Sequence, residues 1–349
     1  MVSVKFKVTW KTIILLALGL IAFFIYLYLF NVDIPAIIET AKSINLSLYF
    51  LAVAFVVFEA LFFSLSWRTL LEFLSVKLSV WKAFLYVWYS VFIDIIIPAE
   101  SISGEVSRAY LVAREQNGTS GKVVASLVAH RLIGMIVYIA SLLVSASILI
   151  IRGQVIGTVL NLMVLLTVLT AIFLILLLLL CVREHWTLKI VNAIFRLAEY
   201  LGRGRWKIAR FKDDAVKAAR MFHDSMREFW HAPKTILTSF GFYVVTWFFS
   251  LGTAYLVFLS MGVPVHWSVI VVTNSIIVAI KSIPIGVPFE VGLPEITMTT
   301  LYMILLPGIS MQICATATVL TRILTVWLRF FIGFAVQQWL EIKTLKQQT

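Results

Sequence analysis

Long apolar runs, separated by short polar segments, dominate the chain. Helices need about 20 residues to cross the hydrocarbon core of a bilayer. Six uninterrupted runs have roughly that length or more: Thr12–Phe30, Ser47–Ser66, Val124–Ile151, Val155–Val182, Thr235–Ser260 and Gln312–Leu340. The pattern predicts an all-α polytopic membrane protein with about six transmembrane helices.

Two further apolar stretches are interrupted by proline. The first, Trp81–Ile97, meets Pro98 and continues as the amphipathic segment Glu100–Gln116. The second, Ser268–Ile283, reaches a segment with two prolines and resumes over Ile296–Leu306. Proline breaks helices, and broken backbone at membrane depth survives only where protein or a water-filled cavity satisfies it. Each stretch is therefore predicted to form a re-entrant helical hairpin.

The distribution of charge gives this arrangement an orientation. Only 13% of the residues are charged, about half the share of a soluble domain, and the formal net charge is +12. With six spans and two hairpins, 23 of the 29 Lys and Arg residues fall on the side of the N-terminus. The positive-inside rule makes that side cytoplasmic. We predict a multi-pass protein of the cell membrane with both termini in the cytoplasm, a first hairpin open to the cytoplasm and a second open to the exterior.

A basic segment, residues 183–234, holds twelve basic and six acidic residues. Apolar residues recur within it at helical spacing: Ile190, Ile194, Leu197, Leu201, Val216, Phe222, Met226 and Phe229. This favours amphipathic helices lying on the anionic cytoplasmic leaflet. A solvated basic loop is the alternative.

The two interrupted stretches share a spacing of charged residues. In each, a proline is followed by glutamates two and seven residues later: Pro98, Glu100 and Glu105, then Pro288, Glu290 and Glu295. Arg131 lies 26 residues after Glu105, and Arg322 lies 27 residues after Glu295. Since the hairpins open to opposite sides, residues 81–151 and 268–340 are predicted to be inverted half-sites within one membrane domain, 1–349. Inverted repeats with broken helices point to a binding site near the bilayer midplane. Chance alignment of a few charged residues is the alternative.

Charged residues at membrane depth are the candidate functional residues, because each costs about 2.5–3.5 kcal/mol at a helix centre. They must pair with one another or line a hydrated cavity. The predicted headgroup-binding residues are Arg131, Arg322, Lys281, Arg108, Glu105, Glu295, Glu100, Glu290 and Asp94. Arginine suits phosphate because its planar fork donates two hydrogen bonds. Two purely structural ion pairs, Glu105–Arg131 and Glu295–Arg322, are the alternative.

Three other polar residues are interpreted as structural. Glu59 is taken as a satisfied buried carboxylate, His130 as a hydrogen-bonded core histidine, and Arg329 as a side chain that snorkels to the headgroups. Cys181 and Cys314 lie in apolar runs and indicate neither a disulfide framework nor a metal site. Since no nucleotide, zinc-protease or serine-nucleophile motif is found, we expect no catalytic residue, metal ion or cofactor, and no nucleic-acid partner.

At the two breaks the chain resembles the membrane region of lysylphosphatidylglycerol synthases, the flippase-like domain family. The matching stretches are residues 98–100, 104–108 and 130–131, then residues 284–295 followed by Arg322. The resemblance implies a helical domain that binds and translocates lipids with charged headgroups, here without the transferase domain fused to some members. His130 stands where the family commonly has Glu, and Pro288-Phe289-Glu290 replaces a Pro-Gly-Gly-type turn. The identity of the headgroup therefore does not carry over.

These observations predict a non-enzymatic protein that flips a lipid with a charged, phosphate-containing headgroup. Its partners would be a membrane phospholipid or polyprenyl-phosphate lipid, with a separate transferase and a homo-oligomer left open. A membrane-embedded transferase acting on such lipids is the first alternative, because carboxylates near arginine can serve as a base and a phosphate clamp. An ion-coupled solute transporter is the second.

Overall fold

The computed structural model describes residues 34–97, 102–116, 118–151, 157–201, 209–281 and 292–346, together with residues 21, 24, 28 and 153. Throughout these ranges the regular structure is helical, and no strand occurs in them. The helices are α2 (Ile34–Ser43), α3 (Leu46–Phe73), α4 (Val80–Ile96), α5 (Ile102–Glu115), α6 (Ser120–Ile151), α7 (Gly157–Val182), α8 (Glu184–Leu201), α9 (Ala209–Trp230), α10 (Pro233–Ser260), α11 (Trp267–Lys281), α12 (Leu293–Leu305), α13 (Met311–Arg322), the π-helix η2 (Ile323–Leu328) and α14 (Arg329–Lys346).

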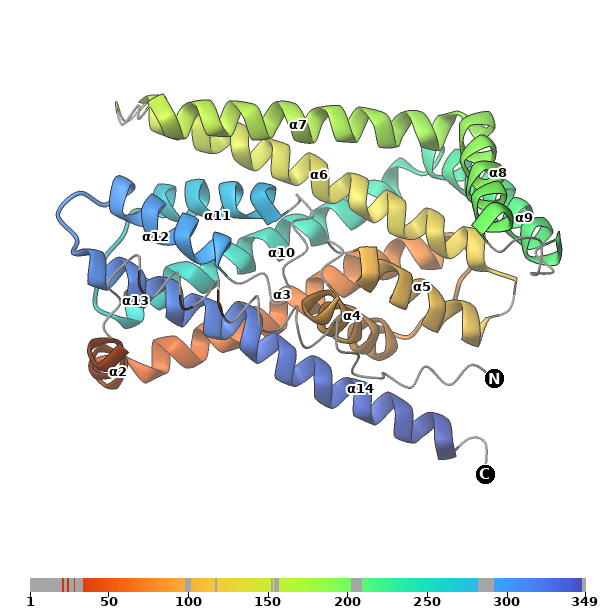
Figure 1. Cartoon of the computed structure of the whole chain (residues 1–349). Helices are drawn as coiled ribbons and strands as arrows, with labels where there is room; N and C mark the ends of the chain where they lie inside the picture. The colour runs from red at the N-terminus through yellow and green to blue at the C-terminus, as the bar shows by residue number, and fades with distance from the viewer. Residues whose placement is uncertain are drawn as a thin grey trace.

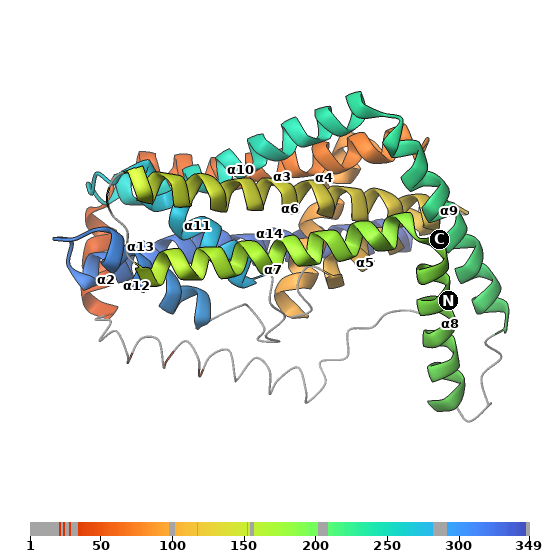
Figure 2. The same cartoon turned by 90° about the horizontal axis from the view of Figure 1, so that it is seen from above.

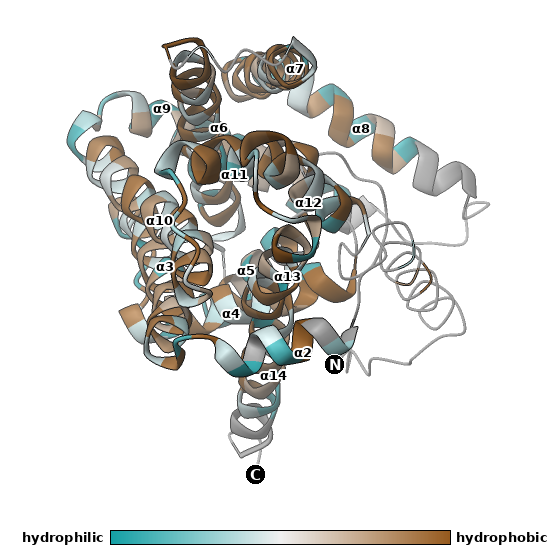
Figure 3. Cartoon of the chain, turned by 90° about the vertical axis from the view of Figure 1, so that its left-hand side faces the viewer, coloured by the Kyte–Doolittle hydropathy of each residue, from teal (hydrophilic) through white to brown (hydrophobic). Residues whose placement is uncertain are grey.

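Five helical segments of the described chain are long and apolar enough to cross a membrane: Leu46–Phe73, Ser120–Ile151, Gly157–Val182, Pro233–Ser260 and Met311–Glu341. They confirm five of the six predicted spans. The remaining one, Thr12–Phe30, lies largely outside the described residues. Apolar residues dominate the long helices, whereas α8 alternates between hydrophobic and hydrophilic residues (Figure 3).

The long helices run side by side, and two pairs of shorter helices lie at opposite ends of this bundle (Figures 1 and 2). The α4–α5 pair lies toward the end that carries α8, α9 and the C-terminal part of α14. The α11–α12 pair lies toward the other end, near α2 and the start of α13. The members of each pair pack against each other. Two helix pairs thus stand where two hairpins are predicted, although the prolines of both breaks lie outside the described residues.

Helices α3 and α10 form the most extensive helix–helix contact in the bundle. Phe249 of α10 packs on Phe55 and Phe62 of α3, with ring centroids 4.9 and 5.5 Å away. Farther along, the Ser66 and Ser239 hydroxyls each donate to the other residue's carbonyl oxygen, at 2.8 and 2.9 Å. Lipid is as apolar as leucine, so close packing and interhelical hydrogen bonds of this kind hold membrane helices together.

The last span departs from the prediction of one continuous α-helix. The π-helix η2 separates α13 from α14, and its hydrogen bonds run from residue i to i+5 rather than i+4. Seven residues of ideal α-helix would leave Arg322 and Arg329 only about 20° apart around the axis. The wider π-helical turn changes this angle around the helix axis, so Arg322 and Arg329 face different neighbours.

The basic segment forms the two predicted amphipathic helices, α8 and α9. The apolar residues of α9, however, are covered by protein rather than left free for a leaflet. Phe222, Met226 and Phe229 are buried in a core shared with α3 and α6. The prediction that this face of α9 lies on lipid is therefore wrong, because the bundle itself buries it. Ile190 and Ile194 of α8 are exposed, so α8 keeps an apolar face that a leaflet can cover.

Candidate functional site

Asp94 ties the first helix pair together. It stands in the last turn of α4, and its Oδ1 accepts hydrogen bonds from the Ser103 hydroxyl and the Gly104 N–H, both at 2.6 Å. A Cβ on Gly104 would lie 2.2 Å from Asp94 Oδ2 and 2.7 Å from the Ser90 carbonyl oxygen. Glycine is therefore needed for α5 to approach α4 this closely. Asp94, which is predicted to bind the headgroup, therefore has a structural role: it holds the start of α5 against α4.

The first predicted ion pair, Glu105 with Arg131, is present between α5 and α6. Glu105 lies in the first turn of α5, where its Oε2 is 3.1 Å from Arg131 Nη1 on α6. The side chains of Arg131 and Glu105 are 19% and 20% exposed. This pair, called the first pair below, is reachable from outside the protein.

The second predicted ion pair, Glu295 with Arg322, is present between α12 and α13 and is buried. Glu295 lies in the first turn of α12, and its Oε1 is 2.5 Å from Arg322 Nε. Its Oε2 accepts the Gly292 N–H at 2.6 Å, and Gly292 has a φ of 103°, a conformation that glycine adopts easily. The Arg322 and Glu295 side chains are 7% and 3% exposed. This second pair thus repeats the first in position but not in accessibility.

Arg108 and His130 are buried side by side near the first pair. The Arg108 guanidinium lies over the rings of Trp67 and Phe63, 5.0 and 5.4 Å from their centroids. His130 packs edge-on against Phe63 at 4.5 Å and lies 5.1 Å from Tyr243. Among the described residues, Arg108 Nε, Arg108 Nη1 and His130 Nε2 have no hydrogen-bond partner. The expectation of a hydrogen-bonded His130 is therefore not met at Nε2, and two donor nitrogens of Arg108 have no acceptor among the described residues.

A third ion pair was not foreseen from the sequence. Arg329 Nη2 at the start of α14 lies 2.5 Å from Glu59 Oε2 in the middle of α3. The prediction that Arg329 snorkels to the headgroups is wrong, because η2 turns it toward α3, where Glu59 neutralises it. The sequence shows that Glu59 and Arg329 are opposite charges at membrane depth. Because they are 270 residues apart, their spacing does not predict that they form a pair.

The remaining predicted ligands lie outside what the structure describes. These are Glu100, Glu290 and the side chain of Lys281. Within the described ranges, no group of three or more His, Cys, Asp and Glu residues is arranged to hold a metal ion. What the described residues offer chemically is paired carboxylates and guanidinium groups, with Arg108 holding spare donors in an apolar, aromatic environment. Such groups suit recognition of a phosphate or another oxyanion.

The chain can be compared with known proteins on this basis. None of the curated proteins matches it. The description of the matching family is "Lysylphosphatidylglycerol synthase TM region", and the match covers residues 14–333, which include both helix pairs and the Glu105–Arg131, Glu295–Arg322 and Glu59–Arg329 pairs. The chain belongs to the family of lysylphosphatidylglycerol synthase transmembrane regions.

Proposed function

We propose that this protein binds a lipid with a charged, phosphate-containing headgroup and moves it from one leaflet to the other. The observation that carries the proposal is the unequal exposure of two corresponding ion pairs. The first pair is about one-fifth exposed, and the second pair is closed. In an alternating-access carrier built from inverted repeats, the site is reached from one side of the membrane at a time, so corresponding parts of the two repeats differ in exposure. Family membership supports a role in lipid biology.

The proposed site combines both half-sites near the bilayer midplane. In this proposal α4–α5 and α11–α12 are re-entrant hairpins that enter from opposite sides. Arg131, Arg322, Arg108 and Lys281 bind the phosphate. Four carboxylates orient these cations or bind a cationic group of the lipid: Glu105, Glu295, Glu100 and Glu290. Asp94 acts as a positioning residue, because it holds the start of α5, which carries Glu105 and Arg108.

The proposed orientation follows from the basic helices. The C-terminal part of α14 lies at the same end as α8 and α9 (Figure 1). The positive-inside rule makes this end cytoplasmic in the cell membrane. The exposed apolar residues of α8 would then rest on the anionic leaflet. The lipid would be a membrane phospholipid or a polyprenyl-phosphate, handed on in the second case to a separate transferase.

Scrambling of labelled phospholipid in proteoliposomes tests the proposal. Wild-type protein should move lipid between leaflets, and Arg131→Ala should slow this at least tenfold. Arg68→Ala is the matched control, because Arg68 also pairs with a glutamate, Glu72, but at the partly exposed surface of α3. Transfer no faster than in protein-free vesicles, with folded protein, would remove the proposal. Mass spectrometry of the lipids after the assay tests the transferase alternative, since a translocator leaves headgroups unchanged.

A further inference from the structure

The third ion pair, Glu59 with Arg329, lies deep in the membrane and is nevertheless partly exposed. Glu59 stands near the middle of the 28-residue span α3. Its side chain is 14% exposed, and that of Arg329 is 22% exposed. The first pair is exposed to a similar extent, whereas the second pair is closed. A space large enough for water therefore reaches the third pair.

The positions of neighbouring residues show that this exposure is not to lipid. Residues two positions apart lie about 200° apart around an α-helix, on opposite sides. Phe331, two residues after Arg329 on α14, is 62% exposed, so Arg329 faces away from the lipid. On α3, Ala52 and Ser66 lie seven residues before and after Glu59, on nearly the same side of the helix. Both are 0% exposed, so the face that carries Glu59 is interior.

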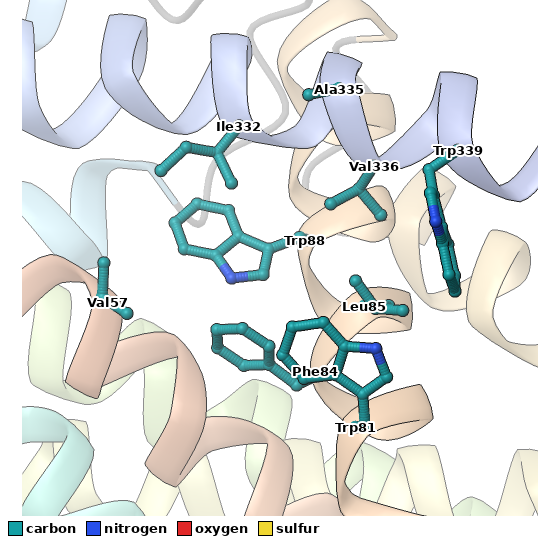
Figure 4. Close-up of a pocket in the computed structure, with 9 residues that line it drawn as sticks. All are labelled: Val57, Trp81, Phe84, Leu85, Trp88, Ile332, Ala335, Val336 and Trp339. Atoms are coloured by element: carbon teal, nitrogen blue, oxygen red, sulfur yellow. The ribbon is translucent and has the colours of Figure 1, made fainter.

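The apolar groove between α3, α4 and α14 does not explain the exposure either. Its nine lining residues are hydrophobic, and neither Glu59 nor Arg329 is among them (Figure 4). Val57, which lines the groove, lies two residues before Glu59 and therefore on the other side of α3. Charged groups inside a membrane protein face one another, water or a polar ligand, because charge in hydrocarbon is costly. The third pair therefore lines an internal polar space.

Two tyrosines lie beside the third pair. Tyr138 of α6 lies close enough to Glu59 and Arg329 to interact with both charges. Tyr138 is partly exposed, although Ile136, on the opposite side of α6, marks the lipid-facing side with 46% exposure. Tyr243 of α10 donates a hydrogen bond to the Tyr138 hydroxyl oxygen at 3.1 Å. Because Tyr138 accepts this bond, its own O–H can donate to an oxygen of a ligand.

The polar space lies between the two half-sites. Arg131 is seven residues before Tyr138 on α6, and Arg322 is seven residues before Arg329 along the last span. Seven residues of helix rise about 10 Å. Helix α6 starts at the end of the bundle that carries α8 and α9, whereas α13 starts near the opposite end (Figure 1). A headgroup that passes from one half-site to the other therefore meets the third pair on its way.

We propose that Glu59, Arg329 and Tyr138 form a midplane binding site for the phosphate of the transported lipid, a site that rests on the proposed function. The Arg329 guanidinium and the Tyr138 hydroxyl donate hydrogen bonds to the phosphate oxygens. Glu59 compensates the charge of Arg329 while the site is empty, so the guanidinium is not left alone at membrane depth. Inorganic phosphate presents the same oxygens, so the experiments below include it.

Labelling of single cysteines tests whether the space holds water. Full-length protein in nanodiscs is treated with a charged methanethiosulfonate reagent, which reacts with the thiolate that forms in water and not in hydrocarbon. Tyr138→Cys should be labelled about tenfold faster than Ile136→Cys, although Ile136 is the more exposed residue. The wild-type chain, whose Cys181 and Cys314 are buried, gives the background. Labelling of Tyr138→Cys no faster than that of Ile136→Cys would overturn the inference.

Matched phenylalanine variants test whether the site binds phosphate. Tyr138→Phe removes the donating hydroxyl and keeps the ring. Tyr49→Phe is the control, because the Tyr49 hydroxyl donates to the Leu320 carbonyl oxygen, at 3.1 Å. We expect Tyr138→Phe to weaken binding of dioctanoyl-phosphatidylglycerol about tenfold, and Tyr49→Phe to leave it unchanged, by native mass spectrometry. Dioctanoylglycerol has the same chains and no phosphate, so Tyr138→Phe should not weaken its binding.

The results that would overturn the phosphate site are distinct. If Tyr138→Phe binds dioctanoyl-phosphatidylglycerol as wild type does, or weakens dioctanoylglycerol equally, the hydroxyl does not bind the phosphate. If inorganic phosphate binds as tightly as the lipid and Tyr138→Phe weakens it equally, the site binds a free ion and its assignment to the lipid is wrong. We expect inorganic phosphate at the same concentration not to displace the lipid.

The scrambling assay separates this inference from the proposed function. If Tyr138→Cys is not labelled and Tyr138→Phe binds lipid normally, while Arg131→Ala still slows scrambling, the midplane site is wrong and the translocator stands. If Tyr138→Phe selectively weakens phospholipid binding while wild-type protein scrambles nothing, the third pair belongs to a lipid site and the translocator is wrong.

Discussion

Arg322 Nε on α13 lies 2.5 Å from Glu295 Oε1 on α12, and the other oxygen of that carboxylate accepts the Gly292 N–H at 2.6 Å. Both side chains are buried, so this pair joins the second helix pair to the last span with little help from water. Removing one partner of a buried ion pair leaves an uncompensated charge, which costs about 3–5 kcal/mol. The first pair, about one-fifth exposed, keeps some access to water.

The two pairs should therefore contribute differently to stability. We expect Arg322→Ala to lower the melting temperature clearly more than Arg131→Ala, as measured by thermal unfolding in nanodiscs. Glu295→Gln should restore part of the stability of Arg322→Ala, because it removes the stranded negative charge. Lys82→Ala serves as the control, since the Lys82–Glu115 pair is more exposed than either and should contribute less than about 1 kcal/mol. If Arg322→Ala and Arg131→Ala lowered the melting temperature equally, the prediction that the more buried pair contributes more to stability would be wrong.

A shared phosphate would couple the two half-sites. If Arg131 and Arg322 bind one headgroup, each alanine substitution should weaken binding of the same anionic lipid by about 1.5–3 kcal/mol, or about 10- to 150-fold. The double mutant should deviate from the sum of the single effects, because neighbouring groups on one ligand are not independent. Lipid binding is measured by native mass spectrometry. Additive stability losses with unchanged lipid affinity would leave two structural ion pairs and no shared site.

The third pair should respond to exchange of its charges. Glu59→Gln leaves Arg329 without its carboxylate at membrane depth and should destabilise the protein. The double variant Glu59→Arg with Arg329→Glu restores opposite charges between α3 and α14 and should recover part of the melting temperature. If Arg329 instead reached the headgroups, Glu59→Gln would have little effect and the exchange would recover nothing.

The sequence predicted those features that depend on local pattern. Long apolar runs located five described spans, and proline breaks located the gaps between α4 and α5 and between α11 and α12. The shared offsets of Glu105 and Glu295 also predicted their arginine partners, because each glutamate begins a helix that packs beside the next long one. The spacing of charged residues therefore predicted the Glu105–Arg131 and Glu295–Arg322 pairs but not the Glu59–Arg329 pair.

What the sequence missed depends on packing between distant segments. A π-helical turn leaves no clear residue pattern in the sequence. The change in helical phase between Arg322 and Arg329 could therefore not be predicted. The partner of Glu59 depended on that phase. The amphipathic pattern of α9 similarly could not distinguish burial on a lipid leaflet from burial on α6, since both satisfy the same apolar face.

The contact between Gly104 and Asp94 gives the most selective test of the first half-site. Gly104→Ala adds a methyl group where Asp94 Oδ2 and the Ser90 carbonyl oxygen already lie, and overpacking of this kind costs about 1–3 kcal/mol. It should push α5 from α4, raise hydrogen exchange of the α5 amides and slow lipid scrambling. Gly241→Ala is the control, because a Cβ at this helical glycine of α10 meets nothing within 4 Å.

Asp94→Asn then separates a structural role from a ligand role. Asparagine keeps one oxygen that can accept from Ser103 and Gly104, so α5 should keep its wild-type hydrogen exchange. If Asp94 only positions α5, lipid binding should also stay near wild type in Asp94→Asn and fall in Asp94→Leu, which has no acceptor. If Asp94 instead bound a cationic part of the headgroup, Asp94→Asn would lower lipid affinity while α5 exchange stayed unchanged. Measuring both quantities on both variants decides whether this carboxylate belongs to the site or to its support.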